Sequence, residues 1–195
     1  MNEKPAKNTP KKRKTDVKNP EKAAETPVAK KPEKIRITFV CTGNTCRSAM
    51  AEKIFKEELT RRGLKDKFAI NSFGLRVREG DEINPKAVLA LSDLGYKAGK
   101  HKAKPLTLAA AKKADLIVCM TARHKAEINL EKAYTVGDIT GGGDVSDPYG
   151  APVSEYVRAA KYLIYSVDET LELAEKLFNE KVNQTEEKPR KGDKR

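Results

Sequence analysis

Along the middle of the chain, short apolar runs alternate with stretches in which apolar residues recur every three or four positions. The runs are rich in β-branched and aromatic residues, which is typical of buried β-strands. Four runs predict strands, at residues 35–40, 67–74, 115–121 and 133–139. The first strand stops at Cys41, where the pattern changes to helical spacing within a few residues.

Helical spacing fills the segments between and after these runs. From Ser48 onward the apolar positions share one face, and Gly63 is placed to end this helix. Asn84 as N-cap, Pro85 in the first turn and Gly95 as a stop signal predict a second helix. Further helices are predicted at residues 105–114 and 122–130, and one long amphipathic helix at residues 153–178.

Strands that alternate with helices predict an α/β domain, in which a parallel sheet is covered on both faces by helices. In such a sheet the ligand site lies at the carboxyl ends of the strands. The loop that follows Cys41 and the glycine-rich loop that contains Asp147 are both expected to emerge at this edge. These two loops are therefore the candidates for a functional site.

The two ends of the chain do not follow this pattern. The first 34 residues contain eleven basic, five acidic and five proline residues, and they carry half of the net charge of +12. Segments with so few apolar residues cannot bury enough surface to offset the entropy lost on ordering. Residues 1–34 and 179–195 are therefore predicted to be disordered tails on either side of a domain of residues 35–178. The basic tail either solvates the domain or binds a polyanion weakly, since it has no aromatic residue and no recognisable nucleic-acid module.

Composition limits the location and the metal chemistry. No apolar stretch is long enough to span a membrane and the N-terminus lacks the apolar region of a secretion signal, so the cytoplasm is the expected location. Three cysteines do not make a disulfide framework. The spacing of Cys41 and Cys46 does not match the usual zinc pairs, and His101 and His124 are distant in sequence, so no metal site is predicted.

The segment "VCTGNTCRS" has the composition of an anion-binding loop. Where a chain turns from a strand into a helix, successive backbone N–H groups point inward and the helix N-terminus adds partial positive charge. Gly43 allows the turn, and Asn44 tolerates a positive φ. Cys41 would then be a stabilised thiolate nucleophile, Arg47 could hold two phosphoryl oxygens in a fork, and Ser48 could donate to the sulfur.

Each of these residues also has an ordinary structural explanation. A cysteine at a strand end is often a small buried hydrophobe, and an arginine alone can be a surface charge. Their joint occurrence between a strand and a helix favours a phosphate-binding loop that contains a nucleophile. The residues assigned to phosphate binding are Thr42, Gly43, Asn44, Thr45, Cys46, Arg47 and Ser48.

This segment resembles the active-site loop of the low-molecular-weight protein tyrosine phosphatases, V-C-x-G-N-x-C-R-S, and the resemblance continues through "SFG", "ADLIVCMT" and "DPYG". It implies a four-stranded parallel sheet of order 2-1-3-4, with Cys41, Arg47 and Asp147 as catalytic residues and no metal or organic cofactor. Asp147 would protonate the leaving atom after Cys41 attacks phosphorus, and would then activate the water that hydrolyses the phosphocysteine. The alternative for Asp147 is a turn-forming Asp-Pro pair.

The resemblance also bears on the substrate, which would be a phosphorylated protein. Thr45 stands where tyrosine-directed members carry a bulky aliphatic residue and where the bacterial arginine-directed branch carries threonine. Tyr149 would form a wall of the cleft, and this position is often phenylalanine in the arginine branch. Phosphoarginine is therefore the predicted substrate, and phosphotyrosine is the alternative.

Three further points concern the cysteines. Arsenate reductases with a similar first loop need two more cysteines just after the third strand, whereas this chain has Cys119 within that strand and Thr121 after it. A non-catalytic phosphate-binding module is disfavoured because all the catalytic residue types are present. The resemblance implies that Cys46 forms a reversible disulfide with Cys41 that protects the nucleophile; otherwise Cys46 only packs beneath the loop.

Overall fold

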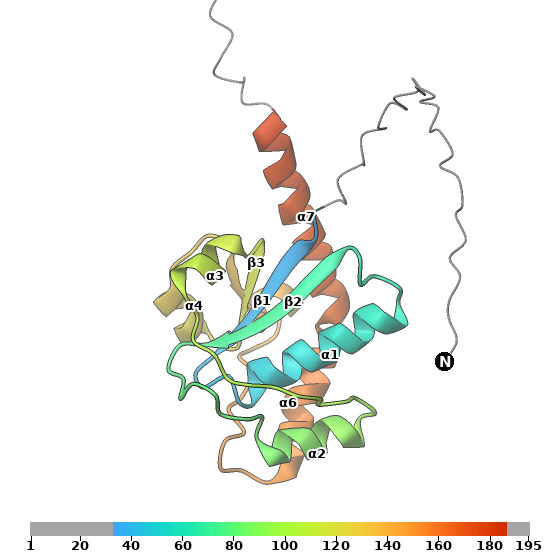
Figure 1. The fold of residues 1–195 in the computed structure, drawn as a ribbon, viewed down its shortest axis with the longest axis vertical. Helices are drawn as coiled ribbons and strands as arrows, with labels where there is room; N and C mark the ends of the chain where they lie inside the picture. The colour runs from blue at the N-terminus through green and yellow to red at the C-terminus, as the bar shows by residue number, and fades with distance from the viewer. Residues whose placement is uncertain (1–32, 187–195) are drawn as a thin grey trace, which may run out of the picture. The chain divides into compact units, whose positions relative to one another are not determined.

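The computed structural model describes residues 33–186, and four parallel strands form its sheet in the order β2-β1-β3-β4 (Figure 1). This confirms the predicted fold class and strand order. The strands are β1 (Ile35–Cys41), β2 (Phe68–Gly74), β3 (Leu116–Cys119) and β4 (Ala133–Thr135). The helices are α1 (Arg47–Arg61), α2 (Pro85–Asp93), α3 (Leu108–Lys113), α4 (Ala122–Ile128), α5 (Val136–Thr140), α6 (Val153–Tyr165) and α7 (Val167–Glu186).

Apolar side chains cover both faces of the sheet. In β1, Ile37 and Phe39 belong to the larger core, which includes residues of α1, α2, α6 and α7. Val40 belongs to the smaller core with Ile117 and with Ala111 of α3. Figure 1 shows α1, α6 and α7 on one side of the sheet and α3 and α4 on the other. A strand that is buried on both faces gives Cys41, its last residue, a fixed position.

The two candidate loops do meet at the carboxyl edge of the sheet. Met120 N donates to Val40 O (3.0 Å), which brings the end of β3 beside the end of β1. Val145 N in turn donates to Met120 O (2.8 Å). The chain that carries Asp147 therefore runs directly beside the loop after Cys41, as predicted.

Two element predictions were wrong, each because of a cap. The strand expected at residues 133–139 ends at Thr135, because Thr135 and Asp138 form a reciprocal capping box that starts α5. The single helix expected at residues 153–178 is two helices separated at Ser166, which is fully buried and donates from Oγ to Leu163 O (2.8 Å). Amphipathic spacing continues across this break, so the pattern did not reveal it.

The last helix extends beyond the C-terminal domain boundary that the sequence predicted. Helix α7 continues past the boundary expected at residue 178 as far as Glu186, so the first part of the expected polar tail is helical. The rest of that tail, residues 187–195, and the basic tail up to residue 32 lie outside the described residues.

Candidate active site

The sulfur of Cys41 lies at the end of β1, within reach of a backbone N–H and of the Ser48 hydroxyl, which also donates to Phe73 O (3.2 Å). Cys41 is only 3% exposed. Its Sγ lies 2.9 Å from Ser48 Oγ, and the backbone N–H of Asn44 donates to it at 3.3 Å. Hydrogen bonds to a sulfur favour its anionic form. The arrangement can therefore hold a thiolate at the entrance to α1, where the helix dipole also favours negative charge.

Asn44 holds the loop in shape. It is fully buried and has a positive φ of 56°. Its Nδ2 donates to Ser48 Oγ and to Ser72 Oγ, at 2.9 Å in each case. Its Oδ1 accepts from Lys104 N (3.1 Å), and its carbonyl oxygen accepts from His101 Nε2 (2.7 Å). Asn44 thus joins the nucleophile loop to β2 and to the segment before α3.

The hydrogen-bond chain continues from Ser72 to a buried carboxylate. Ser72 Oγ donates to Glu52, which is 6% exposed on α1, and Lys56 Nζ donates to Glu52 at 2.5 Å. Burial opposes the charge of Glu52, but hydrogen bonds from Lys56 and Ser72 hold its pKa below the ordinary value. The burial of Glu52 was not predicted, because the apolar positions of this helix were expected to form its buried face.

The tight turn depends on a different glycine from the one expected. Gly43 does not have a positive φ, and a Cβ there would meet nothing closer than Thr45 Oγ1 at 3.7 Å. The left-handed residue of the loop is Asn44, as its residue type allows. At Gly74, the last residue of β2, a Cβ would lie 2.6 Å from Thr42 O and 3.0 Å from Asn44 N. The loop therefore needs glycine at Gly74, where the backbones approach closely.

Arg47 and Asp147 lie in direct contact. Arg47 is 4% exposed; its Nη1 donates to Val145 O (3.2 Å) and its Nη2 to Asp147 Oδ2 (2.7 Å). The Asp147 side chain is 52% exposed, so this ion pair lies at the boundary between the protein and solvent. Tyr149, two residues further, is 75% exposed. The structure thus brings a thiol, a guanidinium and a carboxyl to one site.

Thr45 and Cys46 form the far side of the loop. Thr45 is half-buried, its carbonyl oxygen accepts from Asn84 N (2.9 Å), and its Oγ1 lies 3.7 Å from Cys46 Sγ. Burial raises the pKa of the Cys46 thiol. Cys119 is fully buried inside β3, and burial raises its pKa to about 12. Cys119 is thus a core thiol, and Thr121 caps α4 with its side chain.

Both histidines touch the loop, which the sequence analysis missed. His101 donates to Asn44, as described above, and burial lowers its pKa. His124 Nε2 lies 2.9 Å from Thr42 Oγ1. The sequence offered no signal for these contacts, because each histidine is more than fifty residues from the loop position it meets.

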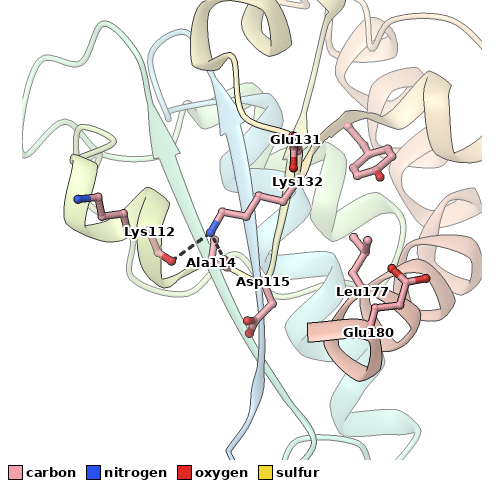
Figure 2. Close-up of a pocket in the computed structure, with 8 residues that line it drawn as sticks. Lys112, Ala114, Asp115, Glu131, Lys132, Leu177 and Glu180 are labelled. Atoms are coloured by element: carbon pink, nitrogen blue, oxygen red, sulfur yellow. Dashed lines mark hydrogen bonds between the residues drawn. The ribbon is translucent and has the colours of Figure 1, made fainter. Parts of the chain in front are cut away.

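The described residues offer no metal cluster beside this site, and a cavity lies elsewhere in the fold. In residues 33–186 no group of three or more His, Cys, Asp or Glu side chains could hold a metal ion, and no helix there could cross a membrane. A cavity of about 350 Å³ lies beside the residues that precede β3 and β4, at the opposite edge of the sheet, and Figure 2 shows the side chains that line it. There Lys132 Nζ donates to the carbonyls of Lys112 (3.0 Å) and Ala114 (2.5 Å), at the end of α3.

Known proteins are similar to this chain in sequence and in fold. The model of the low molecular weight phosphotyrosine protein phosphatase family matches residues 36–187, so the chain belongs to this family and the resemblance is confirmed. The protein-arginine-phosphatase of Bacillus subtilis is 39% identical over 128 residues, which are 62% of this chain and 83% of that protein. The low molecular weight protein-tyrosine-phosphatase PtpB of Staphylococcus haemolyticus is 32% identical over 143 residues, 68% of this chain and 95% of that one.

One similar solved structure contains a phosphorylated active-site residue. A cysteine-to-serine mutant of the YwlE arginine phosphatase, with a phosphorylated active-site serine, matches with a TM-score of 0.64 and 33% identity, covering 73% of this chain and 95% of that one. In that relative, a phosphoryl group is attached to the residue that replaces a cysteine.

Proposed function

We propose that this protein is a cysteine-dependent phosphatase that removes the phosphoryl group from phosphoarginine in proteins through a phosphocysteine on Cys41. The observation that carries the proposal is the contact of Cys41 Sγ with Ser48 Oγ and the Asn44 N–H, at the start of α1 and at the edge of the sheet that also carries Arg47 and Asp147. The phosphorylated serine of the YwlE mutant supports the covalent intermediate.

The first step transfers the phosphoryl group to sulfur. The Cys41 thiolate attacks phosphorus, a P–S bond forms, and the P–N bond to the guanidinium breaks. The backbone N–H groups from Thr42 to Arg47 and the Arg47 side chain stabilise the charge on the phosphoryl oxygens. Asp147 gives its proton to the departing nitrogen.

The second step regenerates the enzyme. The Asp147 carboxylate removes a proton from a water molecule, whose oxygen attacks phosphorus and breaks the P–S bond. Inorganic phosphate leaves, Cys41 returns to the thiolate, and Asp147 regains its proton. The chemistry uses only groups of this chain and water.

Arg47 has to exchange partners during this cycle. Its Nη2 is bound to Asp147 Oδ2, so a phosphoryl oxygen has to compete with that carboxylate for the guanidinium. A phosphoryl group is a strong bidentate partner for arginine. Once it has replaced Asp147, the freed carboxylate takes up a proton from solvent and faces the substrate, as a proton donor to the leaving nitrogen must.

In this proposal, Thr45 determines which phosphorylated side chain the enzyme prefers. Its side chain is half-buried at the loop, and it ends in a hydroxyl group that can bond to a guanidinium, whereas a longer aliphatic side chain would suit a phenyl ring. Among the relatives, the Bacillus subtilis protein is named for phosphoarginine. Phosphotyrosine is the second candidate, because PtpB is named for it and because the exposed Tyr149 is an aromatic wall for either substrate.

The test compares kcat/KM for a phosphoarginine protein and a phosphotyrosine peptide in the parent, Thr45→Val and Thr45→Ile. Valine removes only the hydroxyl, and isoleucine adds bulk, so the two variants separate polarity from size. We expect the parent to prefer phosphoarginine and Thr45→Ile to shift the ratio toward phosphotyrosine by about tenfold or more. An unchanged ratio in both variants would refute the role of Thr45.

The remaining alternatives have simple controls. A non-catalytic phosphate-binding module would show no turnover in the parent protein, whereas the proposal predicts turnover in the parent and none in Cys41→Ser. The expected cytoplasmic location and the weak polyanion binding by residues 1–34 stay predictions. An electrophoretic mobility assay with and without these residues tests the second of them.

A further inference from the structure

His124 connects the nucleophile loop to the corner between β3 and α4. It is 5% exposed on α4, and both of its ring nitrogens have partners. Nε2 lies 2.9 Å from Thr42 Oγ1, in the loop, and Nδ1 lies 2.9 Å from Thr121 Oγ1, at the N-cap of α4. A histidine that only filled space would not need a polar partner at each end.

The direction of these hydrogen bonds follows from the donors that are available. Thr121 Oγ1 already accepts from the backbone N–H of His124 (3.2 Å), so we assign its hydroxyl hydrogen to the bond with Nδ1. Nδ1 is then the acceptor, so Nε2 carries the ring hydrogen and donates it to Thr42 Oγ1. Burial, and then the positive charge of Arg47, lower the pKa of His124, which keeps the ring neutral at pH 7.

The same corner holds the loop that carries Asp147. Met120 O accepts from Val145 N (2.8 Å), and Ala122 N donates to Asp144 Oδ1 (2.8 Å). Val145 O in turn accepts from Arg47 Nη1 (3.2 Å). Residues 120–124 are thus bonded both to the loop with the nucleophile and to the loop with the carboxyl group.

We propose that His124 is a positioning residue, which holds the phosphate loop through Thr42 and sets its distance from the loop of Asp147. The proposal rests on the proposed function only in that the loop binds phosphate. Thr42 supplies one of the first N–H groups of the loop, so freeing its side chain lets these groups turn away from the phosphoryl oxygens. His124 itself touches no reacting atom.

Two substitutions at His124 separate positioning from packing. In His124→Gln, the amide nitrogen can take the place of Nε2 and donate to Thr42. In His124→Asn, the shorter amide can replace only Nδ1, so Thr121 keeps its partner and Thr42 loses its own. Both variants remove the buried ring and replace it by a primary amide, so each is the control of the other.

The measurements are kcat and KM for an aryl phosphate, the dissociation constant of inorganic phosphate by calorimetry, and the midpoint of thermal unfolding. We expect both variants to unfold at similar, lowered temperatures. His124→Asn should weaken phosphate binding and lower kcat/KM by about tenfold, whereas His124→Gln should stay within about threefold of the parent. Equal phosphate affinities in the two variants would overturn the proposal, even with lowered stability.

A double-mutant cycle tests the path through Thr42. In a Thr42→Val background, where Nε2 has no partner, His124→Asn should produce no further loss of phosphate affinity. Additive losses would show that His124 acts by another route, against the proposal. Because calorimetry needs no turnover, a parent protein that bound phosphate without hydrolysing the aryl phosphate would refute the proposed function and leave this test intact.

Discussion

Replacing Asn44 by alanine tests the hydrogen-bond network beneath the nucleophile. Asn44→Ala removes three side-chain hydrogen bonds, to Ser48 Oγ, to Ser72 Oγ and from Lys104 N. It also places alanine at a φ of 56°, in the left-handed region. The two effects can be separated, because the chain offers a second asparagine in the same backbone conformation.

The magnitude follows from these two contributions. Each lost hydrogen bond in a buried site costs about 1 kcal/mol, and so about 3 kcal/mol for the three. Alanine in the left-handed region costs about 1 to 2 kcal/mol more. We therefore expect Asn44→Ala to lower the free energy of unfolding by about 4 to 5 kcal/mol, which is unusually large for one substitution.

Asn129 supplies the control. It is exposed, ends α4 with a φ of 48°, and is the other non-glycine residue with positive φ in residues 33–186. Asn129→Ala should cost only the backbone contribution of about 1 to 2 kcal/mol. Urea unfolding of the parent and both variants gives the difference. If Asn44→Ala costs no more than Asn129→Ala, the network does not stabilise the loop and this reasoning fails.

Two further predictions concern protonation and oxidation. Burial lowers the pKa of His101 below 6.5, so between that lowered pKa and about 6.5 the unfolded chain binds a proton that the native chain does not bind. The free energy of unfolding should therefore fall as the pH decreases through this window, and His101→Gln should make this pH dependence weaker. An unchanged slope in the variant would contradict the assignment. Mild peroxide should oxidise Cys41 to a sulfenic acid that Cys46 converts to a disulfide with loss of water. Since burial raises the pKa of Cys46 above its ordinary value of 9.0, the bond should form faster as the pH rises through 9.0 and beyond. Peptide mapping by mass spectrometry detects the bond, and its absence at every pH would show that Cys46 only packs.

The sequence predicted the parts of the site that are local in the chain. Cys41, Asn44, Arg47 and Ser48 lie within eight residues, and a strand followed by a helix brings such residues into one loop. The position of Asp147 was also predicted, because parallel strands end at the same edge of a sheet.

The supporting contacts could not be predicted in this way. Ser72, His101 and His124 come from three different segments, and their bonds depend on side-chain directions that periodicity does not encode. Gly43 looked like the flexible residue because it lies inside the loop. The position that excludes a side chain is Gly74. A Cβ there would meet the backbone of Thr42 and Asn44, which the pairing of Gly74 with Cys41 brings beside it.

The missed elements have local causes that compete with periodicity. Residues 133–139 are apolar enough for a strand, but the capping box of Thr135 and Asp138 satisfies the first N–H groups of a helix instead. Helices α6 and α7 share one amphipathic pattern, and the break between them depends on the buried hydroxyl of Ser166.

In the proposed reaction, Cys41 carries the phosphoryl group from phosphoarginine. The most direct measurement mixes the enzyme with a phosphoarginine protein, stops the reaction within milliseconds by denaturation, and maps the phosphorylated peptide by mass spectrometry. We expect one phosphoryl group on Cys41, formed and lost within a single turnover, and none in Cys41→Ala. Turnover of phosphoarginine without phosphocysteine, or with the phosphoryl group on another residue, would contradict it.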